Sequence, residues 1–230
     1  SYKPDDQYHL NEVSFNFKEG NLYTILGRTL SGKTTLLKTI AGLLTPDSGE
    51  IEFDGKNFLK IPVWERNVAM VYQQFINYPH LNVFENIAFP LKQRKIDQSI
   101  INEKVMDALK SVGLLGYENR KIQELSGGQQ QRVSLARSLV KNAKILLLDE
   151  PYAALDILSI KMIQEIIINL QSMERMSIIV CDHNARDLLT CVDRAIVLSN
   201  GKIIASGSPQ EIINDTHARS VYFGNEFKIN

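Results

Sequence analysis

This sequence has little cysteine or tryptophan, and neither sign of charge is in excess. The 230 residues include two cysteines and one tryptophan, and 26 Lys and Arg balance 26 Asp and Glu. Two cysteines, Cys181 and Cys191, exclude a disulfide-rich scaffold and a cysteine-based metal cluster. A formal net charge of zero argues against a general nucleic-acid binder, which normally carries a basic excess.

Long apolar runs are also missing. No run reaches the roughly 18 residues that a membrane-spanning helix needs, and residues 1–13 are too polar for a secretory signal. Hydrophobic residues make up 44% of the chain and charged residues 23%, which excludes disordered and fibrous proteins. We therefore expect a cytosolic globular protein whose thiols stay reduced.

Short apolar runs alternate with helix-like segments along the chain. The run at residues 22–26 precedes a glycine loop and a helix-like segment at residues 33–44. Continuous apolar runs are typical of parallel strands that are covered on both faces, so the sequence predicts an α/β fold. Further strand-like runs lie at residues 50–53, 68–72, 144–148, 177–180 and 195–198.

The stretch from about residue 82 to residue 143 differs, because helical periodicity runs through it and no strand stands out. We expect a helical subdomain at residues 80–138, inserted into a core built from residues 1–79 and 139–230. The apolar face expected for one of its helices comprises Val105, Leu109, Val112 and Leu115.

Residues 27–34 fit the phosphate-loop (Walker A) pattern G-x-x-x-x-G-K-[ST] between a predicted strand and a predicted helix. Backbone N–H groups of such a loop offer partial positive charge to phosphates. We expect Lys33 to reach the β- and γ-phosphates and the Thr34 hydroxyl to bind Mg²⁺. Leu30 stands where a small residue is usual, and a positive φ there would cost roughly 1 kcal/mol or more. The expected nucleotide-binding residues are Gly27, Arg28, Thr29, Leu30, Ser31, Gly32, Lys33, Thr34 and Thr35.

A second apolar strand, at residues 144–148, ends in two carboxylates, Asp149 and Glu150. Ligands bind at the carboxyl edge of an open parallel sheet, which is where these side chains should lie. Asp149 is placed to hold Mg²⁺, as in the Walker B role. Glu150 is then free to orient or deprotonate the water that attacks the γ-phosphate.

Residues 125–132, Leu-Ser-Gly-Gly-Gln-Gln-Gln-Arg, resemble the LSGGQ signature of ATP-binding cassette (ABC) ATPases, and we expect a helix after it at residues 132–141. The resemblance covers essentially the whole chain. It implies a RecA-like P-loop NTPase core of three layers, an antiparallel β region near the start, and the helical subdomain as carrier of the signature. A serine and backbone amides at a helix start also form a second anion site. The signature residues expected to bind nucleotide are Ser126, Gly127, Gly128 and Gln129.

The resemblance assigns further residues. Gln73 is similar to the Q-loop glutamine, which touches Mg²⁺ and links to the membrane partner; Gln74 is adjacent, but the pattern M-V-[FY]-Q favours Gln73. Asp156 resembles the D-loop aspartate. His183 resembles the switch histidine that contacts the γ-phosphate, and the resemblance makes it a catalytic residue with Glu150.

The two ends of the chain bear on the same comparison. Tyr2 is similar to the aromatic residue that stacks on adenine, and Tyr8 is the alternative. The family normally has a strand before this tyrosine, and carbohydrate importers usually append a regulatory β-domain. We find neither in the sequence and therefore expect a truncated, mosaic or chimeric chain.

The family's mechanism implies partners. Each ATP lies between the phosphate loop of one subunit and the signature of the other, which implies a head-to-tail homodimer or heterodimer with two-fold symmetry. ATP and Mg²⁺ close such a dimer and hydrolysis opens it. The resemblance further implies integral-membrane permease subunits, a solute-binding protein, and a peripheral position at the cytoplasmic face of the inner membrane. No nucleic-acid partner is expected.

The type of transporter is indicated by two segments that disagree. Residues 78–92 are very similar to carbohydrate-importer ATPases, whereas residues 182–186 and 220–227 are more similar to the lipopolysaccharide-export ATPase. Because residues 78–92 follow the Q-loop, where the permease docks in this family, we expect import of a sugar-type solute. Lipopolysaccharide export is the alternative, and a non-transport ABC ATPase is the alternative of another class.

Overall fold

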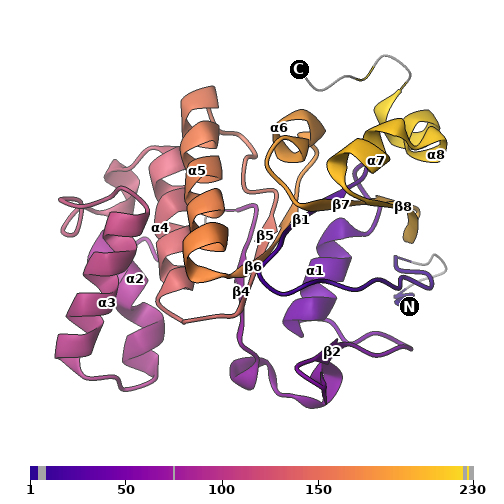
Figure 1. The fold of residues 1–230 in the computed structure, drawn as a ribbon. Helices are drawn as coiled ribbons and strands as arrows, with labels where there is room; N and C mark the ends of the chain where they lie inside the picture. The colour runs from indigo at the N-terminus through magenta and orange to yellow at the C-terminus, as the bar shows by residue number, and fades with distance from the viewer. Residues whose placement is uncertain (5–8, 75, 225–226, 228–230) are drawn as a thin grey trace.

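The computed structural model describes residues 1–4, 9–74, 76–224 and 227. Its centre is a six-stranded sheet in the order β4-β5-β6-β1-β7-β8 (Figure 1). The first five of these strands are parallel, and β8 runs antiparallel to β7. Their bounds are β1 Leu22–Leu26, β4 Val68–Val71, β5 Ile145–Asp149, β6 Ser177–Cys181, β7 Arg194–Ser199 and β8 Lys202–Gly207.

Successive residues of the central strands face two different cores, because side chains alternate across a sheet. In β1, Tyr23 and Ile25 pack in one core with α1 (Lys33–Ala41), whereas Leu22 and Leu26 pack in the other core with the remaining helices. Every residue of β1 and of β5 is buried. The three layers expected from continuous apolar runs are thereby confirmed.

Most helices lie on the face of the sheet opposite α1. Helices α2, α3 and α4 pack on one another, and α4 also packs on α5 (Figure 1). Two short strands near the start, β2 (Glu52–Phe53) and β3 (Lys56–Asn57), pair as an antiparallel hairpin. The helices are α2 Val83–Gln93, α3 Gln98–Ser111, α4 Gly127–Leu139, α5 Ile157–Glu174, α6 Ala185–Leu189, α7 Pro209–Asn214 and α8 Thr216–Ala218. Short 3₁₀ turns are η1 Phe58–Lys60, η2 Val63–Glu65 and η3 Ile122–Glu124, and η4 (Arg219–Phe223) is a π-helical turn.

The predicted strands are confirmed with small shifts at their ends, but other details of the expected organisation were wrong. The helix expected at residues 132–141 begins at Gly127, because Ser126 caps it. Leu115 is 51% exposed, since α3 ends at Ser111 and its apolar face stops at Val112. Strand β8 was not predicted: its polar and small residues carry a weak apolar signal at the sheet edge.

None of the helices in the described part of the chain combines the length and apolar composition that crossing a bilayer requires.

Candidate functional site

The candidate site lies at one edge of the sheet, where the parallel strands end. Residues 27–32 directly follow β1, and Glu150 directly follows β5. Gln73 and His183 stand two positions after the last residues of β4 and β6. Because these strands are parallel, their carboxyl ends meet at the same edge, where ligands bind in open α/β sheets. The fold therefore brings together side chains that are far apart in the sequence.

The loop after β1 is shaped by two glycines. A Cβ atom at Gly27 would collide with the carbonyl oxygen of Leu198 and with Oγ of Ser31, and Gly32 has a φ of 104°. Leu30 adopts a φ of 65°, and its side chain is 96% exposed. The backbone strain considered from the sequence is thus present at a leucine that gains almost no burial in return.

Ser31 and Lys33 give this loop its polar character. Lys33 is buried, and its Nζ donates hydrogen bonds to the carbonyl oxygens of Gly27 at 2.7 Å and Arg28 at 3.0 Å. Oγ of Ser31 is buried and has no hydrogen-bond partner in the described part of the chain. A buried, unpaired hydroxyl costs free energy that an anion's oxygen atoms can recover. With the start of α1 supplying backbone N–H groups, the loop fits a phosphate group.

Thr34 and Asp149 form the polar pair that joins α1 to β5. The Thr34 hydroxyl donates a hydrogen bond of 2.9 Å to Oδ1 of Asp149. Burial raises the pKa of Asp149 above its ordinary value; the hydrogen bond from Thr34 opposes that shift, and the charge of Glu150 adds to it. A cation would stabilise such a desolvated carboxylate, and hydroxyl and carboxylate oxygens are the ligands that Mg²⁺ prefers.

Glu150 stands at the mouth of a pocket. Its backbone has a φ of 47°, and its N–H donates a hydrogen bond of 2.6 Å to the carbonyl oxygen of Cys181, the last residue of β6. The pocket encloses about 400 Å³. Its wall is formed by Gln73, Glu150, Tyr152, Ala153, Ala154, Ile160, Asp182, His183 and Asn184. Three of the residues expected from the sequence, Gln73, Glu150 and His183, therefore share one cavity.

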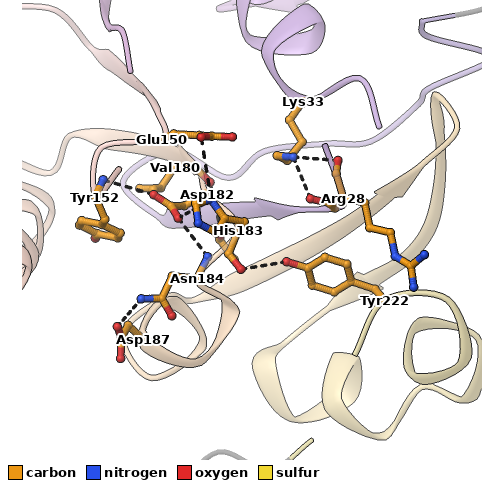
Figure 2. A network of polar contacts seen from close by, with 12 residues as sticks. Arg28, Lys33, Glu150, Tyr152, Val180, Asp182, His183, Asn184, Asp187 and Tyr222 are labelled. Atoms are coloured by element: carbon orange, nitrogen blue, oxygen red, sulfur yellow. Dashed lines mark hydrogen bonds and ion pairs between the residues drawn. The ribbon is translucent and has the colours of Figure 1, made fainter. Parts of the chain in front are cut away.

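His183 is held beside two carboxylates (Figure 2). Its Nδ1 lies 3.5 Å from Oδ1 of Asp182 and 3.9 Å from Oε2 of Glu150, and the imidazole is largely exposed. Asp182 is buried and accepts hydrogen bonds from the backbone N–H groups of Tyr152 at 3.2 Å and Asn184 at 3.0 Å. Sequence reasoning missed Asp182, although a charged residue directly after an apolar strand was a usable signal.

The signature residues lie at the start of α4, outside the wall of this pocket. Ser126 forms a capping box with Gln129: Oγ of Ser126 accepts from the Gln129 N–H at 3.3 Å, and Oε1 of Gln129 accepts from the Ser126 N–H at 2.9 Å. A Cβ atom at Gly128 would collide with Ser159 of α5. Asp156, which caps α5, accepts both the N–H and the hydroxyl of that same Ser159, so Ser159 lies between the two expected motifs.

Of the two tyrosines proposed for adenine stacking, the structure describes Tyr2 alone. Tyr2 forms an isolated antiparallel bridge with Leu10, and its ring lies 6.2 Å from the ring of His9. It is half-buried and packs against the core that includes α1. Tyr8 lies outside the described residues.

Comparison with known proteins identifies the family. Residues 10–153 match the family described as ABC transporter. The chain belongs to this family. The ABC cassette fold is confirmed by solved structures. The ATP-binding cassette MJ0796, in a dimeric post-hydrolysis state bound to ADP and Pi, is 30% identical with a TM-score of 0.81, covering 90% of this chain and 94% of that one. CbiO1 of Clostridium perfringens, part of an ABC transporter complex, is 28% identical with a TM-score of 0.83, covering 92% of this chain and 86% of that one.

Two curated relatives are named as spermidine/putrescine import ATP-binding proteins. The spermidine/putrescine import ATP-binding protein PotA of Mycoplasma capricolum is 46% identical over 211 residues, which is 92% of this chain and 60% of that protein. PotA of Acetivibrio thermocellus is 42% identical over 214 residues, again 92% of this chain and 60% of the relative. The chain thus spans about 60% of the length of the curated relatives that it matches.

Proposed function

We propose that this ABC cassette binds and hydrolyses ATP as the energy-supplying subunit of a solute importer. The observation that carries the proposal is the meeting of the Thr34–Asp149 pair, Glu150 and His183 at the edge of the sheet that also bears the phosphate loop. The 46% identity to a PotA protein supports an importer, and the dimeric relative with ADP and Pi supports nucleotide hydrolysis.

The nucleotide's phosphates are assigned to residues 27–35. Lys33 supplies an ammonium for the β- and γ-phosphates. Ser31 supplies a buried hydroxyl that has no hydrogen-bond partner among the described residues. Thr34, Asp149 and Gln73 are the residues that would hold Mg²⁺, which neutralises charge on the phosphate oxygens when bound. Tyr2 is the residue assigned to the adenine ring.

Glu150 and His183 are assigned to the hydrolytic step. Glu150 has its main chain fixed by Cys181 and its side chain directed to a pocket large enough for water molecules, so it can orient the water and accept its proton. His183 is exposed on the same wall and can donate a hydrogen bond to a γ-phosphate oxygen. The nearby Asp182 stays buried and fixes the loop rather than the phosphate.

The signature belongs to the second subunit's site in this proposal. Residues 126–129 lie at a capped helix start outside the pocket, so one chain presents two half-sites. A head-to-tail pair joins each signature, with Asp156, to the phosphate loop of the other subunit. The helices α2, α3 and α4, which pack on one another, form the subdomain of residues 80–138 that carries the signature.

The transported solute is a polyamine in this proposal. The curated relatives import spermidine and putrescine, whereas the residues at 78–92 favoured a sugar-type solute; the sugar is kept as the alternative. The partners are then permease subunits and a solute-binding protein, and the cassette is peripheral at the cytoplasmic face of the membrane, docked through residues 78–92. Lipopolysaccharide export is less favoured, because its support lies in residues 182–186 and 220–227 alone.

The activity is tested with the full chain and Mg²⁺-ATP. We expect Glu150→Gln to bind ATP, to lose at least about a hundredfold in turnover, and to accumulate as a dimer in size-exclusion chromatography. Glu165→Gln makes the same chemical change at an exposed position of α5 and should hydrolyse ATP as the unmodified chain does. Normal hydrolysis by Glu150→Gln would remove Glu150 from its proposed role.

The solute and the partners are tested by co-purification from native membranes, followed by mass spectrometry. Recovery of a polyamine permease and its solute-binding protein supports the proposal. Recovery of a sugar permease supports the alternative solute, and recovery of lipopolysaccharide-export subunits overturns import.

A further inference from the structure

The C-terminal segment touches the proposed catalytic loop through a single tyrosine. The hydroxyl of Tyr222 donates a hydrogen bond of 3.3 Å to the carbonyl oxygen of His183. Figure 2 shows the ring of Tyr222 extending from the C-terminal helices, with its hydroxyl aimed at the main chain of His183. The two residues are 39 positions apart, so the contact joins separate parts of the chain.

Tyr222 is firmly mounted. It lies in the π-helical turn η4. Its ring packs against the core on the face of the sheet opposite α1 and lies 4.9 Å from the ring of Phe223. The preceding α8 is capped by Asp215, which accepts the N–H of Ala218 at 2.6 Å, and Ala218 is fully buried. A π-helical turn is uncommon and is often found at functional sites. These contacts therefore hold the Tyr222 side chain, and with it the hydroxyl, in a defined position.

The main chain of His183 is where this contact acts. The His183 carbonyl also accepts the N–H of Ala185 at 3.0 Å, and the next N–H, that of Asn184, goes to Asp182. These two hydrogen bonds come from within the turn itself. Tyr222 adds a hydrogen bond from another element, and so resists rotation of the peptide that carries the imidazole.

The protonation state of Tyr222 agrees with its role as a hydrogen-bond donor. Burial raises the pKa of Tyr222 to about 12, although the backbone of Gly27 opposes the shift. Tyr222 thus stays protonated at neutral pH and can donate to His183.

We propose that Tyr222 is a positioning residue, which fixes the main chain of His183 and so sets the orientation of the imidazole for hydrolysis. The inference rests on the proposed function for its catalytic consequence. It gives the segment after β8 a role in turnover: a displacement of η4 would slow hydrolysis without touching nucleotide.

The kinetic test compares Tyr222→Phe with Tyr23→Phe in the full chain. Both substitutions remove a tyrosine hydroxyl that is hydrogen-bonded to the backbone. The Tyr23 hydroxyl, however, accepts the N–H of Lys18 at 2.7 Å, and Tyr23 lies in the core that includes α1, on the other face of the sheet. We expect Tyr222→Phe to lower kcat for ATP about threefold to tenfold with KM changed less than twofold, and Tyr23→Phe to leave both unchanged. Unchanged kcat in Tyr222→Phe overturns the proposal.

An NMR measurement separates this inference from the proposed function. The chain has four histidines, so the imidazole signals of His183 can be assigned by comparison with His183→Gln. We expect Tyr222→Phe to shift the His183 signals and Tyr23→Phe to leave them in place, even in a preparation that hydrolyses no ATP. Unshifted His183 signals in Tyr222→Phe overturn the inference, whereas absent ATPase activity of the unmodified chain overturns only the proposed function.

Discussion

Thr34 Oγ1 lies 2.9 Å from Oδ1 of Asp149, although 115 residues separate the two in the sequence. The hydrogen bond joins the first turn of α1 to the last residue of β5. Both groups are among the three proposed Mg²⁺ ligands, so the bond holds these two side by side before any cation arrives. Such pre-organisation reduces the entropy that binding must overcome.

Replacing Asp149 by Asn is expected to raise the stability of the nucleotide-free protein at pH 7 while abolishing Mg²⁺-dependent ATP hydrolysis. The amide oxygen can still accept from Thr34, but the cost of burying a carboxylate disappears. Urea unfolding at pH 7 should show a higher midpoint for Asp149→Asn than for the unmodified chain. A lower midpoint contradicts this expectation.

The same pair of proteins should show a pH dependence of known sign. Because the folded pKa of Asp149 is raised, the unmodified protein loses stability relative to Asp149→Asn as pH rises through that folded pKa. Below the pKa of the unfolded state, Asp149 is neutral in both states and the penalty vanishes. The gap between the two midpoints should therefore narrow as the pH falls from 7 toward 4.

Adding a methyl group at Gly128 is expected to disturb the contact between the signature and α5. The new Cβ would lie 2.7 Å from Cβ of Ser159, so one of the two helices must move. We expect Gly128→Ala to lose about 1–3 kcal/mol of unfolding free energy, with a loss of ATPase activity. Combining it with Ser159→Gly removes the collision and should restore part of the stability; no restoration would show that the collision is not the cause.

The strained backbone at Leu30 predicts a difference between two small replacements. Leu30 has a φ of 65° and an almost fully exposed side chain, so Leu30→Ala keeps the strain and loses little packing. Leu30→Gly relieves the strain, offset in part by the greater freedom of glycine in the unfolded chain. We expect Leu30→Gly to be more stable than Leu30→Ala by up to about 1 kcal/mol. Calorimetry decides it, and equal melting temperatures contradict it.

The division of each site between two chains predicts a concentration effect. If the signature acts on nucleotide held by a second subunit, ATPase activity should rise more than linearly with the concentration of the cassette. Turnover is measured over a hundredfold dilution at saturating Mg²⁺-ATP. Activity that stays strictly linear counts against a shared site.

The sequence was most informative where one local pattern sufficed. The apolar runs located β1, β5, β6 and β7 because these strands are buried on both faces, and the glycine pattern located the phosphate loop next to β1. It was least informative where tertiary contacts decide. The hydrogen bond from Tyr222 to His183 and the one that Asp182 accepts from the Tyr152 N–H depend on the order of strands in the sheet, which no local pattern encodes.

Lys33 carries a consequence for how tightly nucleotide is held. Its ammonium already donates hydrogen bonds to the carbonyl oxygens of Gly27 and Arg28, so the long side chain has lost most of its conformational entropy before the ligand binds. A phosphate that enters the loop meets a charge that is already held in place. We expect arginine to be a poor replacement for this lysine, because a planar guanidinium differs from an ammonium in shape and in the directions of its donors. We therefore expect the affinity for nucleotide to depend on the fixed position of this ammonium as much as on its charge.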